Sequence, residues 1–407
     1  MAQNLSNFDA VLKDYYEGHV RSVLNNDVKL LKLLQKDTSS WSGRQIIFPV
    51  NVGRNFGVGA RADGGTLPAA QFQRYVKSTI SAINMYGHIE ITGPTMVAAR
   101  DDKGAFTRAT SSEVENMMND LKIHMNILFF GNGSGKYAGV TDNSSNYPTT
   151  VGNVNVDTTR FIRVNMVLDV ISTLGVYKDT LTVTAVNSAT QIAVTGTTGS
   201  VSKVNTDYLV ITGDNGNDPM GLHGIVDDGG DVGTLQGISR SAQQGWQANV
   251  LSASSNRNLD LDLMQRGVDI ALENGGGNID HILSHLGVRR EYINLLTPDV
   301  RFEPLQLQGG YKTLEFNGIT FDFDRHCQYN TVYMLNKASL RMYIQQDFKW
   351  ADEDGSILRA AAVGASAKDS FEAFMRWIGN LGASEGPNKM TRIDKINQVI
   401  ETNILAS

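Results

Sequence analysis

Several short motifs contain residues that could do chemistry, and two of them are rich in glycine. GVGARA (57–62) matches the loose Gly-x-Gly-x-x-Gly/Ala pattern of dinucleotide-binding loops, which works only between a strand and a helix. Glycines and a proline follow it, so no helix is expected there. GNGSGK (131–136) is similar to a phosphate-binding loop, but its glycines are one residue too close, and Tyr137 replaces the residue that would hold magnesium. We interpret both motifs as loops.

Two pairs of residues could act as a metal site or as a nucleophile with its base. His281 and His285 have the spacing of two imidazoles on one helical face, but Ile282 stands where a zinc protease carries its glutamate. The glycine-rich sequence before them also makes a helix through both doubtful. His326 and Cys327 are adjacent, and neighbours on a strand point to opposite faces. Neither pair is predicted to form a site.

The remaining candidates are carboxylates. Asp322 and Asp324 share a face of a predicted strand, but such pairs are common. A glycine-rich acidic run contains Asp214, Asp218, Asp227, Asp228 and Asp231. This run lacks the alternating ligands and closing glutamate of a calcium hand, so a solvated loop is favoured, with a weakly held cation as the alternative. We therefore predict no catalytic residue, no cofactor and no metal site, which favours a structural or binding role over an enzyme.

Composition sets the class of protein. The chain has 407 residues, of which 41% are apolar and 19% charged, as in globular proteins of two or three domains. A net charge of −6 gives no general signature of nucleic-acid binding, and the single cysteine excludes an internal disulfide framework. No apolar run approaches the ~18 residues of a membrane span, and the first residues do not resemble a secretory signal.

The first third of the chain is expected to contain an arm, a hairpin and a long helix. Apolar residues at three- and four-residue spacing predict a helix over 1–36. Alternating residues from 41 and again over 72–92, with a glycine-rich tip between them, predict an extended β-hairpin. The residues over 110–130 predict an amphipathic helix, with a capping box at Ser112 and Glu115. The arm and the hairpin need a partner surface, since a two-stranded hairpin is marginal alone.

The rest of the chain mixes strands and helices. Threonine-rich alternation over 160–212 predicts a small β-rich insertion, compatible with a barrel, and residues 213–250 are expected to be irregular. Helices are predicted at 258–274, with its apolar face on Leu261, Met264, Val268 and Leu272, and at 284–296. Strands are predicted at 319–324, 331–335 and 371–378. Without regular strand–helix alternation, the fold class is α+β.

Six segments, taken in order, resemble one family. They are GVGARADGGTLP (57–68), MYGHIEITGP (85–94), FFGNGSG (129–135), FNGITFDFDRHCQYNTVYMLN (316–336), DFKWADEDGSILR (347–359) and NLGASEGPN (380–388). Together they are similar to the major capsid proteins of tailed bacteriophages (Caudoviricetes), which have the Hong Kong 97-type fold. The family has structural signatures without an invariant catalytic residue, so the match depends on the order and spacing of the segments.

The resemblance implies a domain organisation. The expected parts are an N-terminal arm (1–40), an extended loop (41–93), a peripheral domain with spine helix 110–130 (94–159), the β-rich insertion (160–212), an axial domain (213–339) and a return to the peripheral domain with the C-terminus (340–407).

Charge gives a hypothesis about contacts between subunits. Residues 41–80 carry five basic side chains against Asp63, and residues 347–372 carry six acidic against three basic side chains. We expect the basic hairpin to dock on the acidic region of a neighbouring subunit, setting register more than strength. The residues proposed for this contact are Arg44, Arg54, Arg61, Arg74, Lys77, Asp347, Asp352, Glu353 and Asp354. The alternative is that these charges only keep the loop soluble.

The resemblance also implies function and partners. The chain is expected to self-assemble through hexamers and pentamers into an icosahedral virion shell, built in the host cytoplasm, that encloses double-stranded DNA without sequence-specific binding. A separate scaffolding protein, a portal and decoration or cement proteins are the other expected partners, and no membrane is involved. An encapsulin-like compartment shell and an enzyme with an unrecognised site stay open as alternatives.

Overall fold

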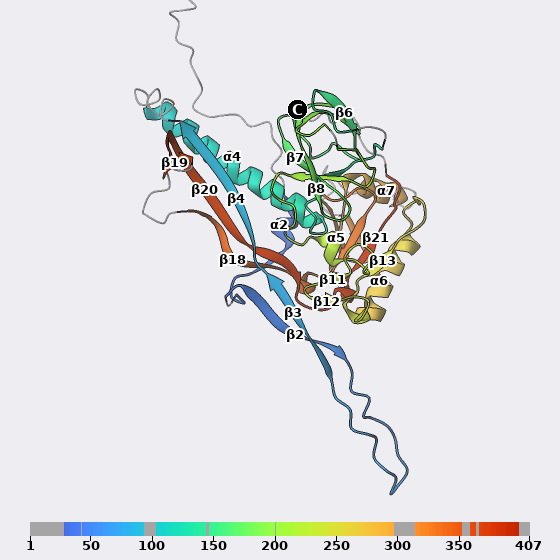
Figure 1. Ribbon diagram of the computed structural model, residues 1–407. Helices are drawn as coiled ribbons and strands as arrows, with labels where there is room; N and C mark the ends of the chain where they lie inside the picture. The colour runs from blue at the N-terminus through green and yellow to red at the C-terminus, as the bar shows by residue number, and fades with distance from the viewer. Residues whose placement is uncertain are drawn as a thin grey trace, which may run out of the picture. The chain divides into compact units, whose positions relative to one another are not determined.

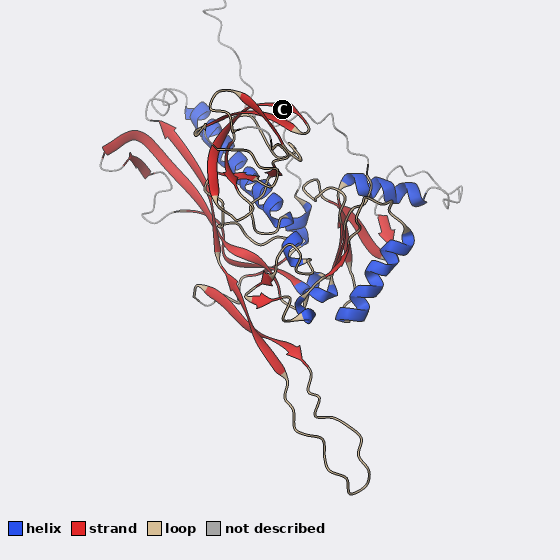
Figure 2. Ribbon diagram, turned by 45° about the vertical axis from the view of Figure 1, so that its right-hand side comes forward, coloured by secondary structure: helices blue, strands red, loops and turns tan. Residues whose placement is uncertain are grey.

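Figure 1 shows the chain as a computed structural model, in which the described residues are 28–41, 43–92, 103–143, 146–199, 201–296, 314–351, 359–363 and 366–398. Strands outnumber helices without regular alternation (Figure 2), which confirms the α+β class. The described residues divide into two compact units. The smaller contains Tyr86–Ile123 and Trp350–Met375, and the larger contains Val28–Met85, His124–Lys349 and the chain from Arg376. Within the described ranges, no helix is both long and apolar enough to cross a membrane.

The smaller unit is built from a long helix and antiparallel strands. Its elements are α4 (Lys103–Phe130), β4 (Ile83–Thr92), β19 (Arg359–Val363) and β20 (Ser366–Ala383), of which α4, β4 and β20 also have residues in the larger unit. Both β4 and β19 pair with β20. A Cβ added to Gly87 would lie 3.0 Å from the sulfur of Met117, so glycine at this position lets β4 approach α4 closely.

The larger unit contains the predicted hairpin. β2 (Gln45–Gly53) and β3 (Arg74–Ser81) pair in antiparallel register from Gln45–Ser81 to Gly53–Arg74. Residues 54–73 between them contain no helix or strand and form the long loop at the bottom of Figure 1. The second half of the predicted second strand is not part of this hairpin, because β4 pairs with β20.

A small closed sheet follows in the same unit. Its strands are β5 (Ala138–Gly139), β6 (Gly152–Asn155), β7 (Val167–Ile171), β8 (Tyr177–Ser188), β9 (Gln191–Gly196) and β10 (Tyr208–Ile211), in the order β5-β10-β7-β8-β9-β6. A bridge between Val140 and Val156 joins the two ends of this order, and Val, Leu and Ile side chains fill the interior. Closure protects edge backbone groups. The β-rich region therefore begins near Ala138, earlier than the predicted residue 160.

The third component of the larger unit is a sheet covered by two helices. Its strands are β13 (Asn249–Leu251), β21 (Thr391–Ile393), β17 (Val332–Leu335), β14 (His281–Ser284), β16 (Ile319–Phe323) and β15 (Leu314–Phe316), in this spatial order. The helices are α6 (Leu261–Gly275) and α7 (Leu286–Leu296). Their buried residues and those of the sheet form one apolar core, which includes Met264, Ile282, Tyr292 and Phe321.

Strand β18 (Leu340–Trp350), whose last residue belongs to the smaller unit, and several short elements complete the larger unit. The short elements are α2 (Lys29–Leu33), β1 (Gln35–Asp37), α5 (Leu222–Ile225), β11 (Thr234–Leu235), β12 (Ile238–Ser239) and short 3-10 helices at Gln244–Trp246, Lys337–Ser339 and Pro387–Lys389. β1 pairs in parallel with β18, and β18 is also a neighbour of β20.

Some predicted helices differ from those in the structure. Of the helix expected over 1–36, residues 1–27 lie outside the described residues, 29–33 are helical, and 35–37 are strand β1 because they pair with β18. α4 begins at Lys103, so Ser112 lies inside the helix and the capping-box prediction is wrong. In α6, Leu261 and Leu272 are exposed at 39% and 53%. Met264 is buried and Val268 packs against the core as predicted, and the buried face also carries Gly267, where an added Cβ would lie 2.7 Å from the sulfur of Met334.

The division into arm, extended loop, peripheral domain and axial domain stays a prediction. The strands and helices predicted for the last third of the chain are present as β16, β17, α6, α7 and a longer β20.

Candidate functional site

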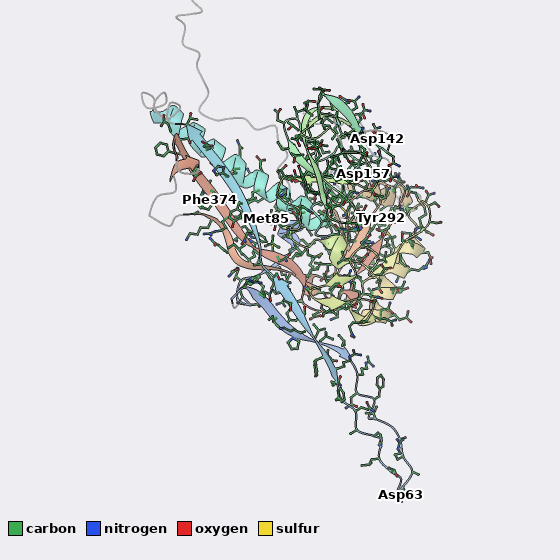
Figure 3. The ribbon with its side chains drawn as sticks, in the orientation of Figure 1. Asp63, Met85, Asp142, Asp157, Tyr292 and Phe374 are labelled. Carbon is green, nitrogen blue, oxygen red and sulfur yellow. The ribbon has the colours of Figure 1, made fainter. Side chains whose placement is uncertain are left out.

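The tip of the hairpin is an exposed apolar surface on a loop with few internal contacts. Phe56, Val58, Leu67 and Phe72 are exposed at 79%, 80%, 81% and 80%. Figure 3 shows these residues' loop, with Asp63 at its far end. Side chains this apolar and this exposed usually mark an interaction surface when they occur together. The loop therefore has the chemistry of a contact element.

The loop keeps its shape through a few polar contacts of its own. Arg61 folds back, and its Nε donates to the Thr66 carbonyl at 2.8 Å while Nη1 donates to the Ala60 carbonyl at 2.9 Å. Across the two arms of the loop, Asn55 Nδ2 donates to the Gln71 carbonyl at 2.9 Å. Arg61 is therefore a structural part of the tip as well as a charge on it.

The root of the hairpin is fixed more firmly than its tip. The Thr79 amide donates to the Gln236 carbonyl at 2.9 Å, and Ser78 Oγ bonds the Gln236 side chain at 3.2 Å. Asn380 Nδ2 donates to the Ser81 carbonyl at 2.9 Å. Gln236 has a positive φ of 54°, which places it at the tight turn between β11 and β12. The direction of the hairpin is thus set by two side chains far away in sequence.

The structure places the basic residues of the predicted contact, but it describes only one of the four acidic residues. Arg44, Arg54, Arg61, Arg74 and Lys77 all lie exposed along the hairpin. Asp347 is half-exposed and forms an ion pair with Lys36 at 3.0 Å. Asp352, Glu353 and Asp354 lie outside the described residues. Docking between the two groups stays a prediction.

The sequence motifs considered for chemistry lie in loops and strands, without the neighbouring elements that the chemistry would need. GVGARA (57–62) is in the hairpin tip with no helix after it, and GNGSGK (131–136) follows α4. His281 is on β14 and His285 follows that strand. Among the described residues, no three His, Cys, Asp or Glu side chains converge to hold a metal ion.

The surroundings of Cys327 differ from the expectation in one detail. His326 and Cys327 lie in the turn after β16 and not on a strand. The imidazole Nδ1 of His326 lies 2.8 Å from Asn126 Nδ2, and Cys327 is fully buried. Burial raises the pKa of the Cys327 thiol, which keeps it protonated and unreactive.

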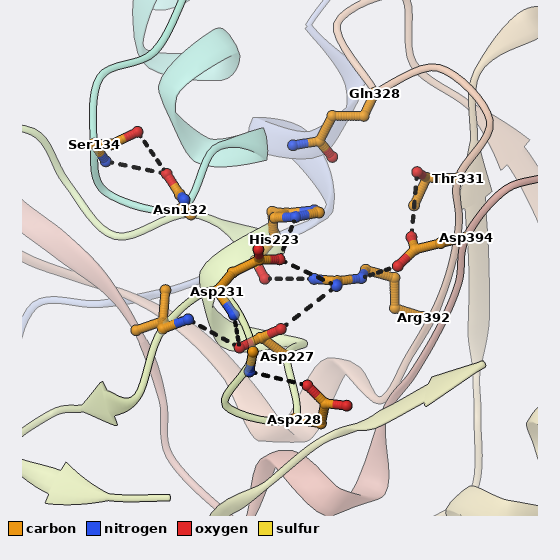
Figure 4. Close-up of polar contacts among 12 residues, drawn as sticks. Asn132, Ser134, His223, Asp227, Asp228, Asp231, Gln328, Thr331, Arg392 and Asp394 are labelled. Carbon is orange, nitrogen blue, oxygen red and sulfur yellow. Dashed lines mark hydrogen bonds and ion pairs between the residues drawn. The ribbon is translucent and has the colours of Figure 1, made fainter. Parts of the chain in front are cut away.

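The structure contains a buried network of ion pairs that the sequence did not predict, and part of the acidic run belongs to it (Figure 4). Asp227 Oδ2 accepts the amides of Gly229, Asp231 and Val232 at 2.9, 3.2 and 3.0 Å. The same oxygen accepts Arg240 Nη1 at 3.1 Å, and both side chains are buried almost completely. The solvated-loop interpretation is therefore wrong for Asp227, because the loop wraps around its carboxylate.

Arg392 ties this loop to the sheet that contains β21. Its Nη2 lies 3.4 Å from Asp227 Oδ1 and 3.3 Å from Asp231 Oδ2, and its Nε donates to Asp394 Oδ2 at 2.9 Å. His223 Nε2 lies 2.9 Å from Asp231 Oδ2. The hydrogen bond from His223, followed by the charges of His223 and Arg392, lowers the pKa of Asp231 to about 2. These bonds fix residues 222–240 to the sheet that contains β21.

Asp218 belongs to the same acidic run, but unlike Asp227 and Asp231 it has no cation beside its carboxylate among the described residues. It is 9% exposed, and its Oδ2 has no hydrogen-bond partner among the described residues. The carboxylate packs on Gly135, whose φ is +67° and where an added Cβ would lie 2.0 Å from that oxygen. Burial, and then the charge of Asp214, raise the pKa of Asp218 to about 8. The folded chain therefore keeps Asp218 protonated at neutral pH.

This gives a prediction for Asp218→Asn. Between the ordinary pKa near 3.8 and the folded value of about 8, the unfolded chain loses a proton that the folded chain keeps, so stability falls as pH rises. Asparagine does not ionise, so this fall in stability with pH disappears. The variant is expected to be more stable than the wild type by about 1–3 kcal/mol at pH 8, with little change at pH 4. Thermal unfolding at both pH values measures the effect, with Asp228→Asn as an exposed control. An equal shift at pH 4 and pH 8 would contradict the assignment.

Comparison with solved structures assigns the fold. The cyanophage A-1(L) capsid asymmetric unit contains a chain similar at TM-score 0.62 and 14% identity, over 96% of this chain and 98% of that one. A structure from Mycobacterium phage Bobi matches at TM-score 0.51 and 10% identity, over 97% and 99%. The capsid of Myoviridae phage XM1 matches at TM-score 0.50 and 6% identity, also over 97% and 99%. Neither a family model nor a curated protein matches the sequence.

Similarity at these identities defines the fold. The chain has the fold of phage capsid subunits, and the resemblance of its sequence to the Hong Kong 97-type fold is thereby confirmed.

Proposed function

We propose that this chain is the major capsid protein of a tailed phage. It self-assembles through hexamers and pentamers into the shell of the virion, which encloses the double-stranded DNA genome. The observation that carries the proposal is the likeness to phage capsid structures over nearly the whole of both chains, including one at TM-score 0.62. Its role is structural, and its principal partner is a second copy of itself.

The exposed hairpin supports this proposal on physical grounds. Ordering a long loop with four apolar side chains in water is unfavourable for a monomer, and becomes favourable when a neighbour buries them. Contacts in which one surface meets a different surface of the next copy close into rings when the rotation allows. We infer that the hairpin makes such a contact, and that a scaffolding protein, a portal and decoration proteins assist or join the shell.

The direct test is negative-stain electron microscopy of the recombinant full-length chain, alone and with the scaffolding protein of the same phage. Closed shells or sheets of five- and six-membered rings are the expected result. Discrete small particles under both conditions would contradict the proposal.

The charge hypothesis gives a second prediction. Because Arg61 also holds the tip together, Arg54→Glu with Arg74→Glu is the cleaner reversal of the hairpin's charge. Exposed ion pairs contribute only ~0–1 kcal/mol each, so we expect a several-fold loss of assembly at low salt that shrinks as salt screens the repulsion. Light scattering during assembly measures it, with Arg266→Glu on α6 as the control. Unchanged assembly and shell stability at low salt would show that these charges only keep the loop soluble.

A further inference from the structure

The larger unit contains a cavity of about 440 Å³ that the proposed function does not use. It lies where the end of α4, the loop after it, the segment leading into β7 and the turn after β16 come together. Figure 4 includes four of its lining residues, Asn132, His223, Asp231 and Gln328. Its volume is in the range of small-molecule sites, and aromatic rings make up much of its wall.

Most charges that line this cavity are already matched. Lys136 Nζ pairs with Asp157 at 3.1 Å. Asp231 is matched by His223 and Arg392. Arg160 differs from them, because no carboxylate of a described residue lies within ion-pair distance of its guanidinium. No carboxylate therefore pairs directly with the guanidinium of Arg160, which feels the charge of Asp324 only from a greater distance.

The guanidinium of Arg160 is held in a fixed plane. Nη2 donates to the Cys327 carbonyl at 2.8 Å. The guanidinium carbon lies 4.3 Å from the centre of the Phe161 ring and 4.6 Å from that of Tyr329. Its buried Nε has no hydrogen-bond partner in the described structure. Tyr329 also forms a hydrogen bond with the guanidinium, and the remaining Nη N–H groups, held in place by the aromatic rings, are suited to bind an oxyanion.

Two histidines near Arg160, His285 and His326, do not share this charge. Burial, and then the charge of Arg160, lower the pKa of His285 to about 4. Burial also lowers the pKa of His326, which lines the cavity. Both imidazoles are therefore neutral at pH 7. His223 is already engaged by Asp231, so the positive charge open to a ligand comes from Arg160 and, once it leaves Asp157, from Lys136.

We propose that this cavity binds a small oxyanion, a carboxylate or a phosphate, with Arg160 as its main ligand and Lys136 as the second. The anion enters the cavity from solution, forms charge-assisted hydrogen bonds with the free donors of Arg160, and replaces Asp157 as the partner of Lys136. The site does not depend on the proposed shell function, so each can fail without the other.

The test uses the full-length, unassembled chain. Thermal unfolding and calorimetric titration are carried out with sodium phosphate and with sodium citrate, against sodium chloride at equal ionic strength. The wild type is expected to show saturable stabilisation by at least one of the two anions, and the anion that acts identifies the preferred chemistry. Arg160→Met is expected to weaken binding at least about tenfold. Arg266→Met, the same change at an exposed position of α6, is expected to bind as the wild type does.

Two further variants keep the proposal testable if Arg160→Met does not fold. Arg160→Lys keeps the charge and loses the planar pair of donors, and Lys136→Met changes a half-exposed side chain. Both are expected to weaken binding, the first more than the second. No saturable response of the wild type to either anion, or an equal response from the wild type and the Arg160 variants, would overturn the proposal.

Discussion

Asp227→Asn is expected to destabilise the folded chain by about 3–5 kcal/mol, because it leaves a buried arginine without its counter-charge. Arg240 is completely buried, and Asp227 lies 3.1 Å from it. The three backbone amides that converge on the same carboxylate oxygen would also lose a charged acceptor. Urea unfolding of the full-length chain, followed by tryptophan fluorescence, measures the loss, since Trp246 is buried beside this loop and donates to the Leu235 carbonyl.

The neighbouring residue provides a matched control. Asp228→Asn is the same chemical change one position along the chain, but Asp228 is exposed and, among the described residues, accepts only the Gly230 amide, at 3.1 Å. It is expected to change stability by less than about 0.5 kcal/mol. Arg392→Met should resemble Asp227→Asn, since it removes the cation that lies near three carboxylates. If the Asp227 and Asp228 variants unfolded alike, the network would not be a source of stability.

This network also shows why part of the site could not be predicted from the sequence. Asp227, Arg240 and Arg392 are separated by up to 165 residues, and no local pattern links them. An acidic run rich in glycine looks the same whether its carboxylates face water or a buried arginine. The partner of Asp227 is determined by the packing of β21 beside this loop, which is a property of the whole fold.

Local patterns were sufficient where an element's own residues decide its structure. Alternation at Ile46, Phe48 and Val50 predicted β2, and the glycine-rich stretch after it predicted the tip. Threonine-rich alternation predicted β8 in the same way. Patterns failed where a distant contact decides: β1 is a strand because it pairs with β18, about three hundred residues later. The buried face of α6 was only half right: Met264 and Val268 pack in the core, but Leu261 and Leu272 are exposed, and Gly267 is buried where the helix approaches Met334 of β17 closely.

The hairpin has one feature that local residues decide and another that distant contacts decide. Its strands were predicted from local alternation, whereas its anchoring was not, because Gln236 and Asn380 reach it from remote parts of the chain. Its need for a partner surface stays a prediction. A firm root and an apolar, weakly braced tip together suit an element that must point in one direction and be buried only on assembly. This division of roles makes the tip the decisive place to separate folding from assembly.

Replacing Phe56, Val58, Leu67 and Phe72 together by serine is expected to abolish shell formation without changing the fold of the unassembled chain. Each side chain is about four-fifths exposed, so the folded monomer gains little from it. Burying each against a neighbour would contribute about 1.5–3 kcal/mol, so even half of the total corresponds to more than a hundredfold in association. Circular dichroism and thermal unfolding check the fold, and electron microscopy checks for shells.

The control for this variant is a pair of exposed apolar residues outside the hairpin. Leu174 and Val176, in the turn between β7 and β8 of the barrel, are exposed at 90% and 60%. Serine at both positions removes apolar surface of the same kind, and shells are expected to form as in the wild type if assembly depends on the hairpin. Normal shells from the hairpin variant would show that the tip is not an assembly contact. Loss of shells in both variants would mean that the barrel turn is a second contact, because two separate apolar surfaces would then each be required.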